Sequence, residues 1–211
     1  MKSLVIVGAG GHGKVAADCA AQNRYKNIYF LDDDREVKSC GKYPVAGTVA
    51  EFRKFMDVDY SDTDFFVAIG NAAIRQKIHR EIETAGGVMV TLIHPDAVIS
   101  DDVRIGSGTV IMAGTVINTG AIIGAGCIVN TASSVDHDCH IGDFVHIAVG
   151  AHIAGTVGIG DRTWVGAGAI VSNNVHICGD CMIGAGAVVV SDIRISGTYV
   201  GIPAKIMGGL L

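Results

Sequence analysis

His137 has the neighbours that acid–base chemistry requires. The local sequence is Asp136-His137-Asp138, and a carboxylate next to an imidazole can fix the tautomer of the ring and raise its basicity. The pKa of histidine lies near neutrality, so a histidine in this setting can serve as a general base. The alternative interpretation is a solvated histidine in a turn.

A second candidate is the glycine-rich stretch Gly8-Ala9-Gly10-Gly11-His12-Gly13, which follows the apolar run 4–7. It matches G-x-G-x-x-G, and Asp32 lies about 20 residues further on, where an acidic residue can bind ribose. Such a turn can hold a diphosphate at a helix N-terminus. The motif alone is a weak signal, since a tight strand-to-helix turn without a ligand gives the same pattern.

Alternating strand and helix patterns would position this turn. Strand-like runs at 3–8, 27–31, 64–69 and 88–93 alternate with helical stretches near 13–23, 48–56 and 72–85. This pattern predicts an α/β, Rossmann-like domain over residues 1–93, with a boundary near His94-Pro95. A full dinucleotide fold needs two βαβαβ halves, and these residues supply little more than one. We therefore expect a nucleotide-sugar rather than NAD.

The remainder, residues 94–211, has a period of six. Every sixth residue from Ile105 to Val189 is Ile or Val, and a small or β-branched residue follows four positions later. This period is typical of a parallel β-helix of hexapeptides, with three hexads per coil. Glycine often follows the aliphatic residue, as in Ile123-Gly124, where we expect it to tolerate the backbone angles of the turn.

Composition limits the remaining possibilities. The net charge of −5 and the lack of a basic cluster argue against nucleic acid, and no apolar segment reaches the ~20 residues of a membrane span. Residues 5–7 are too short for a signal-peptide core, so we expect a cytoplasmic protein.

Cys178-Gly179-Asp180-Cys181 is a C-x-x-C motif without a second pair at zinc-finger spacing. We expect no metal, and corner packing for Cys127, Cys139 and Cys181.

The whole chain resembles a known family. The segments GAGGHGK, FLDDD, AIGNAAIRQKI, LIHPDAVIS and YVGIPAK, together with the hexapeptide repeat, resemble the bacterial sugar O- and N-acyltransferases of the sialic-acid O-acetyltransferase type. NTASSVDHDCHIGDFVHIAVGAHIAG is most similar to the branch that acetylates UDP-4-amino-sugars, as in bacillosamine synthesis. The resemblance implies a left-handed β-helix, although crossovers are usually right-handed. It also implies a homotrimer with acetyl-CoA bound between neighbouring helices.

The resemblance also implies the roles of individual residues. His137 would be the general base and Asp138 its support, although related enzymes carry Glu at this place. Asn130 would lie near the reacting centre, or would be a turn or ladder asparagine. Acetyl-CoA would contact His146, Gly155, Ala167, Ala185 and Lys205, although Lys205 is equally explained as a solvated lysine.

The nucleotide-sugar would lie at the carboxyl edge of the sheet, where ligands collect in α/β folds. The residues expected there are Gly10, Gly11, His12, Asp32, Asp33, Gly70 and Asn71. Arg75 would add a charge to the diphosphate or cap the surface of its helix. His140, His146 and His152 form a histidine ladder with a spacing of six residues. His140 and His152 should be surface residues on different faces from His146.

The sequence thus predicts an acetyl-CoA-dependent N-acetyltransferase of a UDP-linked 4-amino-4,6-dideoxy sugar, working by direct attack. A ping-pong route through Cys139 stays open, because alternation along a strand would point Cys139 the same way as His137. One alternative is an O-acetyltransferase of sialic acid or a related sugar. Another is a non-catalytic module that senses NAD or a nucleotide and is fused to a β-helix scaffold.

Overall fold

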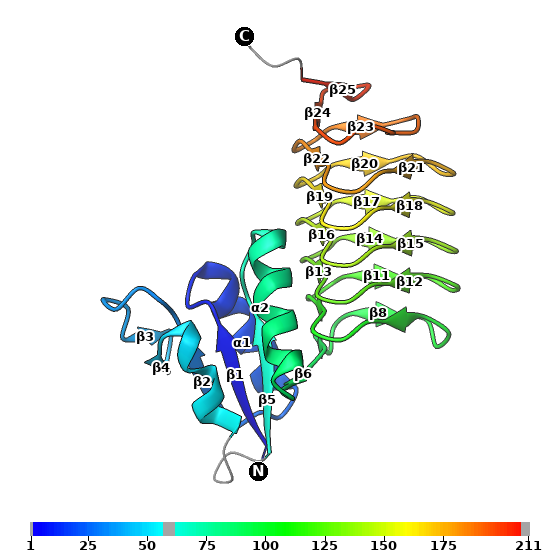
Figure 1. The fold of residues 1–211 in the computed structure, drawn as a ribbon. Helices are drawn as coiled ribbons and strands as arrows, with labels where there is room; N and C mark the ends of the chain where they lie inside the picture. Colours follow the sequence, from blue (N-terminus) through cyan, green and yellow to red (C-terminus); the bar gives the residue numbers. More distant parts are fainter. Residues whose placement is uncertain (1, 57–61, 208–211) are drawn as a thin grey trace. The chain divides into compact units, whose positions relative to one another are not determined.

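The computed structural model describes residues 2–56 and 62–207. The chain divides into two compact units, Met1–Pro95 and Asp96–Leu211 (Figure 1). Each unit has its own hydrophobic core. Among the described residues, no helix has the length and apolar character needed to cross a membrane.

The first unit is a twisted sheet with the strand order β3-β4-β2-β1-β5-β6. Its strands are β1 (Ser3–Val7), β2 (Asn27–Leu31), β3 (Ser39–Cys40), β4 (Tyr43–Gly47), β5 (Thr63–Val67) and β6 (Val88–Met89), and β7 (Leu92–Ile93) follows. Its helices are α1 (Gly11–Gln22), the 3₁₀ helix η1 (Val49–Met56) and α2 (Ala72–Thr84). β1 pairs in parallel with β2 and β5, so the glycine turn follows the central strand.

Burial explains this arrangement. Leu4, Val5, Ile6 and Val7 of β1 are all fully buried, as expected for a parallel strand covered on both faces. The sequence predicted β2 with its observed bounds, and it placed α1 and α2 within two residues. It missed the antiparallel pair β3–β4, whose strands are short and contain Pro44. It also merged β6 and β7 into one strand.

The second unit is the predicted left-handed parallel β-helix, with three faces of two-residue strands stacked every 18 residues (Figure 1). The first face contains β10 (Val110–Ile111), β13 (Ile128–Val129), β16 (His146–Ile147), β19 (Trp164–Val165), β22 (Met182–Ile183), β24 (Thr198–Val200) and β25 (Lys205–Ile206). The second face contains β8 (Val98–Ile99), β11 (Val116–Ile117), β14 (Ser134–Val135), β17 (His152–Ile153), β20 (Ile170–Val171) and β23 (Val188–Val189). The third face contains β9 (Arg104–Ile105), β12 (Ile122–Ile123), β15 (His140–Ile141), β18 (Gly158–Ile159) and β21 (His176–Ile177).

The corners of the helix correct one expectation about glycine. Every sixth residue from Gly108 to Gly186 has a φ between +55° and +72°, and this position lies three residues after the aliphatic one. The glycines directly after the aliphatic residue have another reason. A β-carbon on Gly106 would lie 2.5 Å from the backbone nitrogen of Ala125 in the next coil. These glycines therefore allow coils to stack closely, and they do not supply the turn angle.

The small residues four positions after the aliphatic one are buried at the corners, as predicted. The threonines at this position, and Cys127 and Cys139, donate to a carbonyl of the next coil, whereas the Ser133 hydroxyl donates to the carbonyl of Asn130 in its own coil. Thr109 Oγ1 lies 2.8 Å from the Gly124 carbonyl oxygen, and Cys127 Sγ lies 3.1 Å from that of Gly142. Buried polar groups are thus satisfied inside the helix.

Candidate active site

His137 and Asp138 form the pair that the sequence predicted. Nδ1 of His137 lies 2.9 Å from Oδ2 of Asp138, and the His137 side chain is 53% exposed. This hydrogen bond and the negative charge of Asp136 raise the pKa of His137. With the Nδ1 proton donated to Asp138, Nε2 is the basic nitrogen and is available to a substrate.

The backbone at Asp138 explains how the pair forms. Asp138 occupies the left-handed corner position with a φ of +57°, a conformation that Asp tolerates better than most residues. The same turn breaks the alternation of a strand. Cys139 is therefore buried, its thiol lies 3.1 Å from the carbonyl oxygen of Ala154, and burial raises its pKa. The expectation that Cys139 points with His137 is wrong, and a ping-pong route through this thiol has no support.

Two residues of the preceding coil, both missed by the sequence interpretation, lie against the Asp136-His137-Asp138 turn. Nδ2 of Asn118 donates to Oδ1 of Asp136 at 2.8 Å, and the same oxygen accepts the backbone N–H of His137 at 2.8 Å. The hydrogen bond from Asn118 lowers the pKa of Asp136. Gly120 lies beside Asp138, because a β-carbon there would be 2.6 Å from Oδ1 of Asp138. The 18-residue spacing between coils could have found both residues.

Asn130 and His146 lie together on the first face. Nδ2 of Asn130 is 3.4 Å from Nε2 of His146, and the ring centroids of His146 and Trp164 are 4.2 Å apart. Oδ1 of Asn130 accepts the N–H of Thr131. The side chain of Asn130 thus bonds to His146 and Thr131, and among the described residues no hydrogen bond joins Asn130 to His137.

The histidine ladder lies on three faces, as predicted. His140 is in β15 of the third face, His146 in β16 of the first and His152 in β17 of the second. His140 and His152 are exposed, whereas His146 is buried. His152 also makes a contact that the sequence did not predict, since its Nδ1 is 2.9 Å from Oγ of Ser134.

The residues expected to bind acetyl-CoA are divided between two edges of the helix. Gly155 lies one coil after His137 at the same corner, and a β-carbon there would be 2.6 Å from Cε1 of His137. Ala167 and Ala185 are exposed and stacked at a different corner, where the N–H of Gly186 bonds to the carbonyl of Ala167 at 2.8 Å. Lys205 is exposed on β25.

In the first unit, the glycine turn brings β1, α1 and the segment after β5 close together. Gly8 has a φ of +103°, and a β-carbon there would lie 2.9 Å from the carbonyl oxygen of Ala68. A β-carbon on Gly13 would overlap the carbonyl oxygen of Gly8, so Gly13 allows α1 to pack against β1. β-Carbons on Gly10 and Gly11 would meet nothing within 4 Å. The N-terminus of α1 carries no side-chain cap and faces open space at these two glycines.

The two aspartates after β2 have local backbone partners. Oδ2 of Asp32 accepts the N–H of Ala9 at 2.7 Å, and Oδ1 accepts the N–H of Asp34 at 2.9 Å. Oδ1 of Asp33 accepts the N–H of Val49 at 3.0 Å, at the start of η1. Asp32 therefore shapes the glycine turn itself. A cavity of about 390 Å³ opens beside it, lined among others by Asp34, Arg35, Lys38, Thr48 and Glu51.

The segment after β5 completes this edge of the sheet. Oδ1 of Asn71 accepts the N–H of Ile74 at 3.0 Å and caps α2. Arg75 is 1% exposed, and its Nη1 donates to the carbonyls of Ile69 (2.7 Å) and Gly70 (2.9 Å). The expectation that Arg75 caps the surface of its helix is wrong, because the guanidinium is buried under that turn. Burial, aided by the Arg75 charge, lowers the pKa of His12 to about 4, so His12 is neutral.

Comparison with known proteins agrees with this architecture. The family model described as the PglD N-terminal domain matches residues 3–82. The UDP-N-acetylbacillosamine N-acetyltransferase of Bacillus subtilis (strain 168) is 36% identical over 115 residues, which make up 53% of this chain and 51% of that protein. The chain thus spans about half the length of this curated relative.

Solved structures match over nearly the full chain. The acetyltransferase domain of PglB from Neisseria gonorrhoeae FA1090 is 41% identical with a TM-score of 0.93, covering 98% of this chain and 100% of that one. It has also been solved in complex with acetyl coenzyme A. A histidine-to-asparagine variant of perosamine N-acetyltransferase from Caulobacter crescentus, in complex with CoA and GDP-perosamine, is 36% identical with a TM-score of 0.94. The coverage is 99% of this chain and 98% of that one.

The stacked hexapeptide coils, the exposed histidine–carboxylate pair and the full-length match to acetyltransferase structures place this chain among the hexapeptide-repeat acyltransferases. The chain belongs to the bacterial sugar acyltransferase family that includes the bacillosamine and perosamine N-acetyltransferases. The family resemblance seen in the sequence motifs is confirmed.

Proposed function

We propose that this chain transfers the acetyl group of acetyl-CoA to the 4-amino group of a UDP-linked 4-amino-4,6-dideoxy sugar. The observation that carries the proposal is the His137–Asp138 pair, which leaves a basic Nε2 directed away from Asp138 in a member of this family. Residues of the first unit bind the nucleotide. Residues of the β-helix bind acetyl-CoA.

The chemistry needs one general base. The sugar nitrogen attacks the thioester carbonyl carbon, and His137 Nε2 takes the proton that the nitrogen loses. The tetrahedral intermediate then collapses, the carbon–sulfur bond breaks, and the imidazolium returns the proton to the departing CoA thiolate. The products are the N-acetylated sugar and CoA, with no covalent acyl-enzyme. Asp138 holds the tautomer and stabilises the imidazolium throughout.

The nucleotide would be held by the turn at Gly10 and Gly11. Their backbone N–H groups lie at the positive end of α1 and suit a diphosphate. Arg75, which is buried against the Gly70 carbonyl after β5, adds a positive charge that also acts on His12. The cavity beside Asp32 is of a size to take the ribose and base. Neutral His12 and Nδ2 of Asn71, whose Oδ1 caps α2, would supply further polar contacts.

A homotrimer would complete the acetyl-CoA site. Within one helix, Gly155 lies at the corner of His137, whereas Ala167 and Ala185 line another corner. Packing two copies side by side would bring unlike corners together in a groove between them, which a single helix does not offer. If so, bulky substitutions at Ala167 and Ala185 in one copy should abolish turnover at His137 of the neighbouring copy.

A second candidate substrate is GDP-perosamine. It is favoured by the similarity over 99% of the chain to the Caulobacter crescentus enzyme solved with that ligand. Both candidates share the acetyl transfer and differ in the nucleotide that the cavity at Asp32 would accept. Sialic acid, as an O-acetyl acceptor, has no diphosphate for the glycine turn to bind.

The test is release of CoA thiol from acetyl-CoA with three acceptors: UDP-4-amino-4,6-dideoxy-N-acetylglucosamine, GDP-perosamine and a sialic acid. Turnover with the UDP-sugar, reduced about 10²–10⁴-fold in His137→Ala, is the expected result. His140→Ala is the matched control, because His140 is exposed on the next strand and should leave the rate unchanged. Turnover only with GDP-perosamine would replace the UDP-sugar, and activity on sialic acid alone would overturn the N-acetyl assignment.

A further inference from the structure

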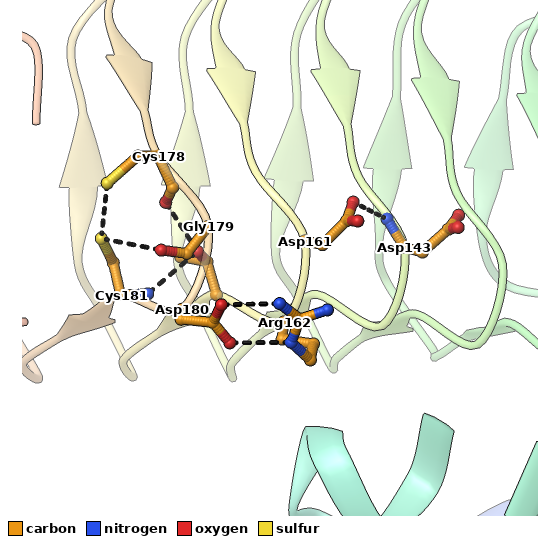
Figure 2. A network of polar contacts seen from close by, with 8 residues as sticks. Asp143, Asp161, Arg162, Cys178, Gly179, Asp180 and Cys181 are labelled. Atoms are coloured by element: carbon orange, nitrogen blue, oxygen red, sulfur yellow. Dashed lines mark hydrogen bonds and ion pairs between the residues drawn. The ribbon is translucent and has the colours of Figure 1, made fainter. Parts of the chain in front are cut away.

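Cys178 and Cys181 face each other at the corner between β21 and β22. Their Sγ atoms are 3.5 Å apart. Figure 2 shows the two sulfurs pointing toward each other, with Gly179 and Asp180 in the bend between the two cysteines. Both cysteines are reduced in the structure. A disulfide bond is about 2.05 Å long, so a modest side-chain movement would bring the two sulfurs into bonding range.

Cys181 differs from the other two corner cysteines. Cys127 and Cys139 each donate to a carbonyl of the next coil at 3.1 Å. The Cys181 thiol instead lies 3.7 Å from the carbonyl oxygen of Gly179 and 3.8 Å from that of Ile195, and its shortest side-chain contact is with the sulfur of Cys178. The reason is a change of register above this coil, where Ile193 is buried and pairs with Ile177 while Ile195 is exposed.

Cys178 also departs from the repeat. It occupies the position directly after the aliphatic residue, which is glycine in the four preceding coils at this corner: Gly106, Gly124, Gly142 and Gly160. Each of those glycines is enforced by close contact with the following coil. At Cys178 the shifted register of the last coil leaves space for a side chain.

The Cys178 side chain is accessible from outside the helix. It is partly exposed and lines a surface hollow of about 480 Å³ on the third face, together with His140, His176, Asp192 and Arg194. Cys181 is only 3% exposed. Burial, with a contribution from Cys178, raises the pKa of the Cys181 thiol. A small molecule in the hollow would therefore meet Cys178 first.

The bend that joins the two cysteines is held from the coil below. Asp180 accepts two hydrogen bonds from Arg162, at 2.7 Å from Nε and 2.6 Å from Nη2, which Figure 2 shows as a bidentate pair. The N–H of Asp180 also bonds to the carbonyl of Asp161 at 2.9 Å. Hydrogen bonds that do not involve the thiols therefore fix the bend, and the bend keeps the two thiols close.

We propose that Cys178 and Cys181 are a dithiol site that exchanges with a low-molecular-weight disulfide and closes to an intramolecular disulfide. The Cys178 thiolate attacks one sulfur of the small disulfide, forming a mixed disulfide and releasing one thiolate. The Cys181 thiolate then attacks the Cys178 sulfur and releases the second. Two protein thiols are oxidised, and the small disulfide is reduced to two thiols. This site does not depend on the acetyltransferase function.

The test is a thiol count after incubation of the native full chain with oxidised glutathione. After quenching, unfolding and alkylation, intact mass should show that alkylatable cysteines fall from six to four, and dithiothreitol should restore six. Peptide mapping should locate the loss of two hydrogens to the peptide that contains residues 178–181. Cys178→Ser should keep all five of its thiols.

Cys127→Ala is the matched control, because Cys127 is a buried corner cysteine bonded to a carbonyl. This variant should fall from five thiols to three. Three results would overturn the proposal: six thiols persisting in the wild type, a lasting glutathione adduct on Cys178, or an equal loss of thiols in Cys178→Ser. Circular dichroism before treatment confirms that each variant is folded.

Discussion

The backbone of Gly155 lies against the imidazole of His137, one coil further along the β-helix. A β-carbon at Gly155 would stand 2.6 Å from Cε1 of His137 and even closer to Nε2, the nitrogen proposed to take the proton. Gly155 therefore sets the position of the base. The bare backbone also leaves the space beside Nε2 open to the substrates.

Gly155→Ala should lower kcat by about 10- to 100-fold, since a misplacement of about 1 Å can cost that much. The methyl group would push the imidazole away from its place beside Asp138. Steady-state kinetics, with a melting temperature for each variant, measures the effect. Asn173→Ala is the control, because Asn173 is exposed one coil further on at the same corner. An unchanged kcat in Gly155→Ala would contradict the positioning role.

Asp138→Asn should shift the acid limb of the pH profile of kcat/KM to lower pH. Asp138 raises the pKa of His137, and only the neutral imidazole accepts a proton, so activity rises as pH passes through this raised value. Removing the carboxylate lowers that pKa, and the neutral form then persists to lower pH. The maximal rate should fall as well, because an amide N–H facing Nδ1 would place the ring proton on Nε2.

The pKa of His137 can be followed directly by NMR titration of its ring nitrogens in the wild type and in Asp138→Asn. Asp138→Glu is the conservative control, since it keeps the carboxylate charge beside the imidazole. It should keep the raised pKa of His137. A raised pKa that survives in Asp138→Asn would assign the effect to Asp136 instead.

Two neighbouring glycines should respond differently to alanine. Gly13→Ala should destabilise the fold by about 1–3 kcal/mol, because its methyl group would overlap the Gly8 carbonyl oxygen and lie 3.0 Å from Cε1 of Phe30. Gly11→Ala meets no atom within 4 Å and should leave the melting temperature unchanged or higher. It should instead raise KM for the nucleotide-sugar, because the methyl group would obstruct the phosphate. Equal melting temperatures for the two variants would argue against this assignment.

Asp32→Ala should raise KM for the nucleotide-sugar by about 10-fold and leave KM for acetyl-CoA unchanged. The carboxylate holds the N–H of Ala9 at 2.7 Å, and its loss leaves a partly buried donor without its acceptor, at a cost of about 1–3 kcal/mol to the turn. Asp18→Ala, which removes an exposed carboxylate from α1, is the control. A parallel rise in both KM values would mean that Asp32 supports the fold in general.

The period of six could be recognised in the sequence because every hexad has the same structure and packs in the same way. Each hexad contributes one aliphatic side chain to the core along the axis of the β-helix, so the six-residue spacing of Ile and Val from Ile111 to Val189 indicates the fold directly. The strands β1 and β2 were equally plain, because both carry continuous apolar runs. The pair β3–β4 was hidden because its two short strands lack an apolar pattern and depend on pairing with β2.

By itself, the sequence determined the two architectures, the glycine turn and the candidate for the base, since these depend on local composition and on a repeat along one chain. The tertiary structure decided which side chains meet. Asn118 reaches Asp136, Gly155 reaches His137, and Cys181 has only long carbonyl contacts, so that its thiol lies closest to the sulfur of Cys178. These contacts join residues about one coil apart, or depend on a register shift at the end of the helix. Their physical origin is the stacking of coils, which places distant residues side by side and turns Cys139 inward next to an outward His137.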